Sequence, residues 1–141
     1  MTPRRRLASL VTTHFRWAPW EEAIRRHGIT IDRPKSSVHP QHASIVYPID
    51  YGYVNDTVGP DGDEVDVFVG SAATGLVGAI FTSDYRKRDE ELKLMYNCTP
   101  GEVYLINGFI NFDRELMEGV LLMRISLAEL ADLIRRDSDV R

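Results

Sequence analysis

Short segments rich in β-branched and aromatic residues, separated by turn residues, recur along most of this 141-residue chain. The segments expected to form strands are Ile29–Ile31, Ser44–Val54, Val65–Gly70, Leu76–Ser83, Glu91–Asn97 and Leu121–Ile125. Pro48 predicts that the second of these is bent or lies at an edge, because proline cannot donate to a strand ladder. Several short strands of this kind are typical of a small, closed β-barrel.

Two segments have the features of helices. Pro19–Gly28 has acidic residues near its start, basic residues near its end and a glycine that ends it. Ser126–Arg136 begins with a serine followed by Glu129, which fits a capping box, and its leucines recur at helical spacing. We therefore expect one domain over residues 1–141, mainly β with α, in which peripheral helices, including a C-terminal one, surround the barrel.

The remaining segments are expected to be loops and turns. Asp32–His42 contains two prolines and two serines and predicts a loop, and Asn55–Asp63 predicts another. Pro100-Gly101 predicts a turn ahead of Val103–Asn107.

Composition narrows the class of protein. The net charge of -4 and the pI near 5.5 argue against a nucleic-acid-binding surface. The single cysteine, Cys98, excludes an internal disulfide framework. No apolar run approaches the ~18 residues of a membrane span, and no signal-peptide core is found. We expect a cytoplasmic protein that binds neither nucleic acid nor membranes.

Three aspartates, Asp61, Asp63 and Asp66, fall within six positions around a glycine turn. In a continuous strand Asp66 points away from Asp61 and Asp63, because side chains alternate between faces. Convergence of the three requires a bend between Asp63 and Asp66. Converged carboxylates need a cation to offset their repulsion, and oxygen ligands suit Mg²⁺, Mn²⁺ or Ca²⁺. A solvated acidic turn is the alternative, and the spacing does not fit an EF-hand loop.

A longer stretch resembles a known family. The segment Tyr47-Pro48-Ile49-Asp50-Tyr51-Gly52-Tyr53 precedes Asp61-Gly62-Asp63-Glu64-Val65-Asp66-Val67. Together these are similar to the YPxxYGY and DGDPxDV motifs of family I soluble inorganic pyrophosphatases, with Glu64 in place of the proline. The resemblance covers residues 46–70 and extends to 95. It implies an OB-like barrel, a homo-oligomer and several bound Mg²⁺ ions, with Mn²⁺ as an alternative.

The resemblance also implies roles for individual residues. The implied metal ligands are Asp61, Asp63, Asp66, Asp84 and Glu91, with Asp89 a rival to Glu91 for its position. Asp63 would also act as general base beside the attacking water. Lys93 and Tyr51 would contact phosphate, and Tyr47 would support the carboxylates.

Several of the family's phosphate-binding residues have no counterpart. The early strand lacks the family's lysine and acids, its arginine falls on His39, and no lysine follows Lys93. We expect Arg33, Lys35 and His39 to replace the lost positive charge, because arginine and lysine are the usual phosphate partners. The alternative is an exposed polar loop. Arg86-Lys87-Arg88 forms another basic stretch, at a predicted hairpin tip where solvation is the commoner outcome.

The function predicted is that of a hydrolase acting on phosphoanhydrides. Inorganic pyrophosphate is the expected substrate, which a metal-activated water would split into two phosphates. One alternative is the same chemistry on a nucleotide or another small diphosphate. A second is a barrel that binds metal or polyphosphate without turnover.

Overall fold

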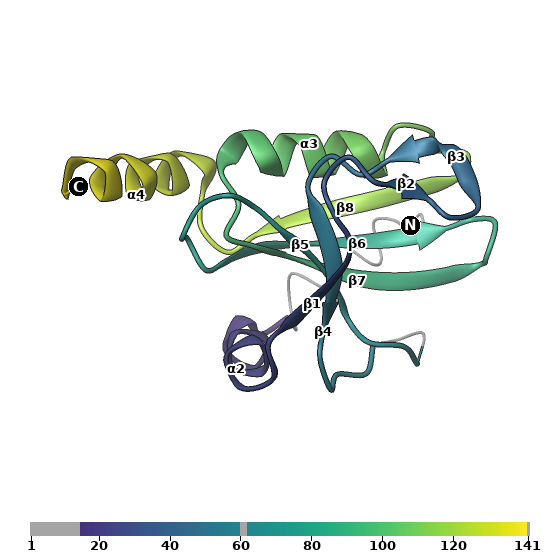
Figure 1. Ribbon diagram of the computed structural model, residues 1–141, viewed down its shortest axis with the longest axis horizontal. Helices are drawn as coiled ribbons and strands as arrows, with labels where there is room; N and C mark the ends of the chain where they lie inside the picture. Colours follow the sequence, from purple (N-terminus) through teal and green to yellow (C-terminus); the bar gives the residue numbers. More distant parts are fainter. Residues whose placement is uncertain (1–14, 60–61, 141) are drawn as a thin grey trace.

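The computed structural model describes residues 15–59 and 62–140, which form strands and three helices (Figure 1). The helices are α2 Trp17–His27, α3 Pro100–Ile110 and α4 Leu127–Val140. The strands are β1 Ile29–Arg33, β2 Val38–His39, β3 His42–Val46, β4 Asp50–Val54, β5 Asp66–Val69, β6 Leu76–Asp84, β7 Asp89–Tyr96 and β8 Met117–Met123. No helix in this part of the chain is long and apolar enough to cross a membrane.

Six strands form one mixed sheet in the order β1-β4-β5-β7-β6-β8, and β2 and β3 form a separate hairpin. Only β5 and β7 run parallel within the six-stranded sheet; its other neighbours are antiparallel. The mainly β class with peripheral helices is therefore confirmed. The strand pairs of the described residues run from β1 to β8 without joining these two strands, so closure of the barrel stays a prediction.

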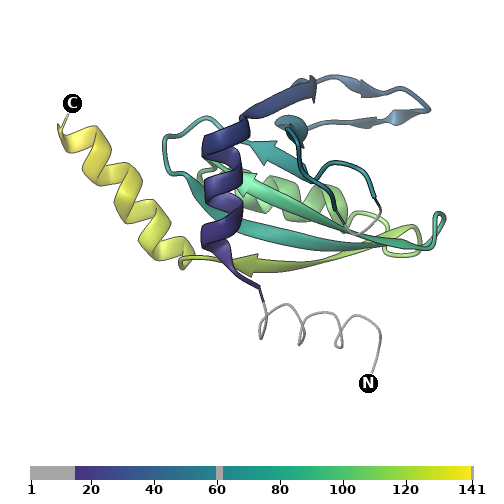
Figure 2. The ribbon, with the colours of Figure 1, turned by 90° about the horizontal axis from the view of Figure 1, so that it is seen from below.

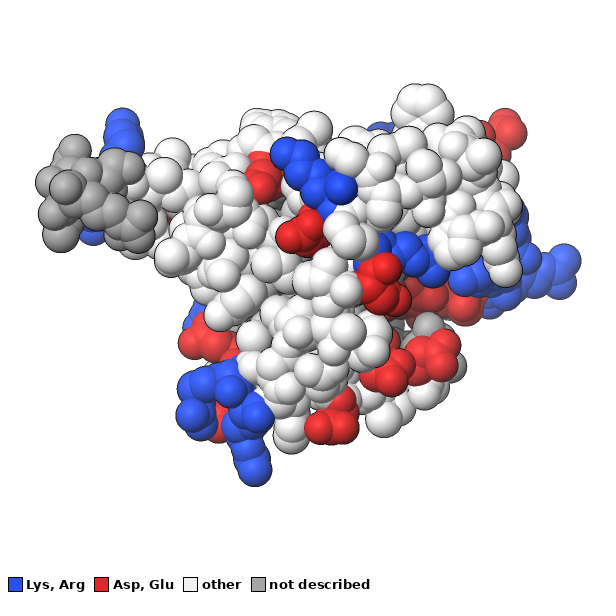
Figure 3. Space-filling view, in the orientation of Figure 1, with Lys and Arg blue, Asp and Glu red and all other residues white. Residues whose placement is uncertain are grey.

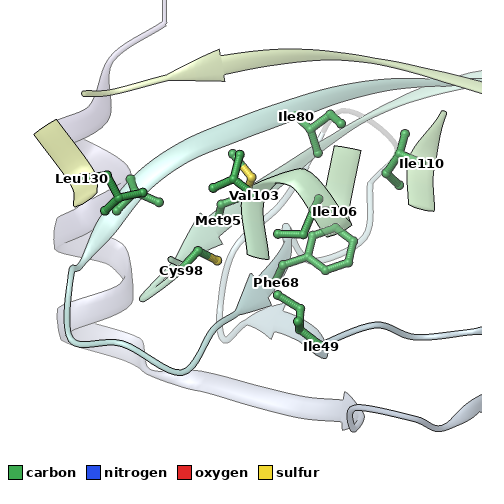
Figure 4. Packing of buried hydrophobic residues seen from close by; sticks show 10 residues of the cluster. Ile49, Phe68, Ile80, Met95, Cys98, Val103, Ile106, Ile110 and Leu130 are labelled. Atoms are coloured by element: carbon green, nitrogen blue, oxygen red, sulfur yellow. The ribbon is translucent and has the colours of Figure 1, made fainter. Parts of the chain in front are cut away.

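The helices α2 and α3 lie on opposite sides of the sheet (Figures 1 and 2). On one side, Val103, Ile106 and Ile110 of α3 pack against sheet residues such as Phe68 and Ile80, and Leu130 of α4 completes this core (Figure 4). On the other side a second core forms around Ile24, Val54, Val67, Ala79 and Leu94, with Phe15, Trp17 and Trp20 packed against it. Both faces of the sheet are thus covered, which explains the continuous apolar run of β6.

The helix α3 was not predicted. Its residues 103–107 were assigned to the segment after a turn, but Pro100 instead lies in the first turn of a helix. Thr99 caps this helix by accepting from the N–H of Glu102, whose carboxylate accepts from the N–H of Thr99. Burial of Val103, Ile106 and Ile110 at helical spacing outweighs the β propensity of the segment.

Two further boundaries differ from those predicted. Ser44–Val54 is two strands, because the chain leaves β3 after Val46 and enters β4 at Asp50, with Pro48 between them. The predicted loop Asp32–His42 contains the end of β1, all of β2 and the first residue of β3. Elsewhere Gly28 ends α2 as expected, with a φ of 74° and its N–H bonded to the carbonyl of Ile24.

The backbone bends ahead of β5, as the aspartate spacing predicted. Gly62 has a φ of 88°, in the left-handed region that favours glycine, and the bend continues through Asp63. The strand then starts only at Asp66. Asp63 and Asp66 therefore do not belong to one continuous strand, and the alternation argument does not force their side chains apart.

Candidate active site

A row of polar side chains occupies one face of the sheet, on β5, β6 and β7. Asp89, Glu91 and Lys93 are spaced two apart along β7 and so share a face. Asp84 of β6 pairs with Asp89, and Asp66 of β5 pairs with Lys93. The register of these three strands therefore brings carboxylates far apart in the sequence to one surface.

Lys93 lies at the centre of this face and is buried. Its Nζ donates to Asp66 Oδ2 at 2.8 Å, to Glu91 Oε2 at 2.7 Å and to Tyr51 Oη at 2.8 Å. An ammonium has three donors, so this geometry satisfies all of them. Two carboxylates share one ammonium, which leaves the group with a net negative charge.

The pKa values of this group reflect its burial. Burial lowers the pKa of Lys93, but Tyr51, Asp66 and Glu91 outweigh it and raise that pKa well above its ordinary value. Burial raises the pKa of the Glu91 carboxyl, and the charge of Lys93 opposes that shift. Burial likewise raises the pKa of the Tyr51 hydroxyl. Tyr51 is therefore a neutral hydrogen-bonding group rather than a base.

Asp84 and Asp89 form a second acidic pair, at the end of the β6–β7 hairpin. Asp84 is buried, and its Oδ1 accepts from the N–H groups of Arg86 at 3.0 Å and Lys87 at 3.1 Å. Asp89 Oδ1 is buried without a hydrogen-bond partner among the described residues. Like charges directly opposite on antiparallel strands repel, so this pair calls for a cation.

The donor set therefore fits a hard divalent cation, with carboxylate oxygens on one face and one buried oxygen lacking a partner. A ready-made cage is absent: within residues 15–59 and 62–140, no three His, Cys, Asp or Glu side chains converge closely enough to hold one ion. Asp63 is exposed in the bend, and Asp61 lies outside the described residues. Both Asp89 and Glu91 lie on the polar face, so both stay candidate ligands.

The expected phosphate-binding residues lie at one side of the polar face. Arg33 donates from Nη1 to Tyr47 Oη at 2.6 Å and lies over its ring. Tyr47 in turn stacks on Tyr51, with ring centroids 5.1 Å apart. Arg33 is thus connected to Lys93 through two aromatic rings, and Tyr47 supports Arg33 rather than a carboxylate among the contacts described.

The other two expected cations differ in position. Lys35 is exposed, and its backbone N–H, not its side chain, is held by Asp50 Oδ1 at 2.8 Å. His39 stacks on Tyr47 with the rings 6.4 Å apart. Burial and neighbouring positive charges lower the pKa of His39, so it is neutral at neutral pH.

Sequence reasoning did not give His42 or the orphaned oxygen of Asp89. His42 was set aside as a weak metal candidate, yet its Nε2 lies 3.4 Å from Arg86 Nη1, across 44 residues. The signal that finds such neighbours is strand register, which a single sequence does not provide. Cys98 takes no part in this site, because it is buried and burial raises the pKa of its thiol to about 12.

Comparison with known proteins places these features in a family. The model of the inorganic pyrophosphatase family matches residues 27–85, which hold both motifs and Asp84. No curated protein has significant sequence similarity to the chain.

Several solved structures are similar in fold. An inorganic phosphatase from Anaplasma phagocytophilum is 18% identical with a TM-score of 0.49, over 76% of this chain and 88% of that one. The pyrophosphatase of Helicobacter pylori is also 18% identical with a TM-score of 0.49, over 79% and 92%. That of Thermus thermophilus is 14% identical with a TM-score of 0.48, over 76% and 86%.

These structural similarities are too distant to bear on function, and the sequence match is the stronger finding. It covers the tyrosine motif, the aspartate motif and the first strand of the acidic hairpin. Through residues 27–85, this chain belongs to the inorganic pyrophosphatase family.

Proposed function

We propose that this protein hydrolyses inorganic pyrophosphate to two phosphates with the help of divalent metal ions, of which Mg²⁺ is the first choice and Mn²⁺ the second. The observation that carries the proposal is the polar face of β5, β6 and β7, where Asp66, Glu91 and Lys93 meet beside the Asp84–Asp89 pair. Pyrophosphate is a compact polyanion, so its hydrolysis depends mainly on charge neutralisation and positioning.

The proposed metal ligands are Asp61, Asp63, Asp66, Asp84 and Glu91, with Asp89 beside them. Bound metal ions would neutralise phosphate charge and lower the pKa of a coordinated water. Asp63 is proposed to accept the proton of the attacking water, and its place in the bend leaves it exposed to incoming substrate. These roles rest on the family motifs and on the chemistry of the carboxylates.

Lys93 and Tyr51 are proposed to contact phosphate. In the present arrangement the Lys93 ammonium neutralises Asp66 and Glu91, which is the role that bound cations would share. The Tyr51 hydroxyl is held by Lys93 and stays protonated, because burial raises its pKa. It is therefore suited to donate a hydrogen bond to a phosphate oxygen.

Phosphate release from pyrophosphate, measured with Mg²⁺ and with a chelator, tests the proposal. Asp66→Asn should lower kcat/KM by about 100-fold or more, because it removes a charge from the polar face at little change in volume. Asp32→Asn, an exposed aspartate of β1, is the matched control and should keep full activity. Release that persists in chelator would exclude the metal-dependent mechanism.

A panel of nucleotides and other small diphosphates should be run in the same assay. Faster release from a nucleotide than from pyrophosphate would replace the substrate while keeping the chemistry. Release from no substrate, together with metal binding, would favour a non-catalytic binding protein.

We also propose that the chain forms a homo-oligomer and works in the cytoplasm. Support for self-association comes from an uncharged surface formed by β3 and α3, where Phe112, Tyr104 and Leu105 are exposed. Support for the cytoplasm comes from Cys98, which is free and buried.

A further inference from the structure

Positively charged and histidine side chains from separate segments meet beside the Asp84–Asp89 pair. Arg86, in the turn between β6 and β7, places Nη1 3.4 Å from Nε2 of His42, the first residue of β3. The His42 ring lies 4.9 Å from that of His39, which in turn stacks on Tyr47. Tyr47 holds Arg33 of β1. We call Arg33, His39, His42, Arg86 and Lys87 the basic cluster.

The basic cluster has more positive charge than its neighbouring carboxylates neutralise. Asp84 Oδ1 lies 3.9 Å from Arg86 Nε, but the same oxygen is already bonded to two backbone N–H groups. Within the described residues, Arg33 and Lys87 form no ion pair. The positive charges of Arg33, Lys87 and Arg86 all help to lower the pKa of His39, after burial itself, which agrees with their close grouping.

The basic cluster borders the polar face that holds the carboxylates. Asp84 pairs with Asp89, which is two residues before Glu91 along β7, a separation on the order of 7 Å. Figure 3 shows basic and acidic side chains next to one another on the side of the molecule toward the β6–β7 turn. A compact dianionic group can therefore lie between cations held by the carboxylates and the side chains of the basic cluster.

The chain needs such a group of cations. Lysine does not occur after Lys93 in the sequence, so no late lysine is available for a phosphate. Arg86 has the properties of a replacement: its guanidinium can pair with two phosphate oxygens at once, and its side chain is 40% exposed. His42, on the opposite hairpin, lies close enough to orient that guanidinium.

We propose that Arg86, together with Arg33 and Lys87, binds the phosphate group of a small diphosphate that lies farther from Asp66 and Glu91. This inference rests on the proposed function and adds a specific site to it. His42 is a positioning residue, which holds Arg86 without contacting the phosphate. The β6–β7 turn thus takes over a role for which the late part of the chain has no lysine.

The test is binding of imidodiphosphate, a diphosphate that resists hydrolysis, in the presence of Mg²⁺, followed by calorimetry. Arg86→Gln should weaken binding and raise the KM for pyrophosphate about 10-fold or more, the effect of losing one charged hydrogen bond. Its kcat should fall less than its KM rises. Lys87→Gln should change both quantities in the same direction by a smaller factor.

Arg88→Gln is the matched control, since Arg88 is exposed in the same turn and does not act on His39. It should leave binding and KM unchanged. Arg86→Lys should restore part of the affinity, because a lysine supplies charge without the paired donors. Thermal unfolding of each variant should match that of the wild type, as these side chains are exposed.

The outcomes separate the two proposals. If the wild type hydrolyses pyrophosphate and Arg86→Gln binds imidodiphosphate as the wild type does, the phosphate site at the β6–β7 turn is wrong and the proposed function stands. Equal losses in Arg86→Gln and Arg88→Gln would also overturn it, because they would show a general charge effect. If the wild type neither hydrolyses pyrophosphate nor binds imidodiphosphate, the proposed function itself fails.

Discussion

At the scale of single residues, Lys93 has the largest electrostatic role of the buried side chains in the described structure. It neutralises Asp66 and Glu91, whose side chains are only 26% and 16% exposed. Lys93→Met should therefore lower the free energy of unfolding in chelator by about 3–5 kcal/mol, because it leaves two carboxylates without their cation. Added Mg²⁺ should recover part of this loss, since a divalent ion can replace the missing charge.

Denaturant unfolding with chelator and with Mg²⁺ measures both effects. Lys35→Met is the control, because Lys35 is exposed and its side chain forms no ion pair among the described residues. A loss no larger in Lys93→Met than in Lys35→Met would contradict the prediction. Recovery of both variants to the same extent would show that Mg²⁺ acts elsewhere.

The individual site residues could be predicted because they belong to a motif or lie at a fixed distance from one. Asp66, Tyr51 and Lys93 were identified in this way, and the structure brings them together with Glu91. The contact of Arg86 with His42 could not be predicted, because it depends on two hairpins meeting across 44 residues. The orphaned oxygen of Asp89 depends equally on the register of β6 against β7.

At the scale of elements, the glycine of the tyrosine motif determines how closely β1 approaches β4. A Cβ added to Gly52 would lie 1.8 Å from the carbonyl oxygen of Thr30 and 2.8 Å from the Cα of Ile31. Gly52→Ala should therefore separate the two strands and cost about 3 kcal/mol or more of unfolding free energy.

Gly108 provides the contrasting substitution. It lies inside α3, and an added Cβ would meet nothing within 4 Å. Gly108→Ala should raise the free energy of unfolding by about 0.5–1 kcal/mol, because alanine loses less backbone entropy in a helix. Thermal or denaturant unfolding of the two variants checks both signs. A mild effect of Gly52→Ala would mean that the β1–β4 pair can move apart at little cost.

Strands and terminal helices could be predicted from local patterns, while α3 could not. The segment 103–107 contains valine, tyrosine and isoleucine, whose propensities favour strands. Its helix is stabilised by the Thr99 cap and by burial against the sheet, and the burial is a tertiary effect. By contrast, Ser126 marks the start of α4 locally, by accepting from the N–H of Glu129 at 3.1 Å.

At the scale of the whole molecule, the polar face and the apolar surface are formed by different elements. The groove between β3 and α3 has a volume of about 580 Å³ and is lined by uncharged residues, among them Val46, Tyr104 and Phe112. Phe112 follows α3 directly and is 92% exposed. One surface thus has both a hollow and a protruding aromatic ring, a combination that suits an isologous contact between two copies.

Phe112→Asp should therefore shift the protein toward the monomer, because it introduces a charge where apolar surfaces would be in contact. Light scattering after size exclusion, over a range of protein concentrations, measures the effect. Val58→Asp is the control, since Val58 is 75% exposed but lies in the loop after β4, away from the groove. A wild type that is monomeric at all concentrations would contradict self-association. A shift of equal size in both variants would mean that the contact lies outside the β3–α3 surface. A monomeric Phe112→Asp variant that keeps wild-type kcat/KM would further show that each copy holds a complete site, as expected from a polar face built within one sheet.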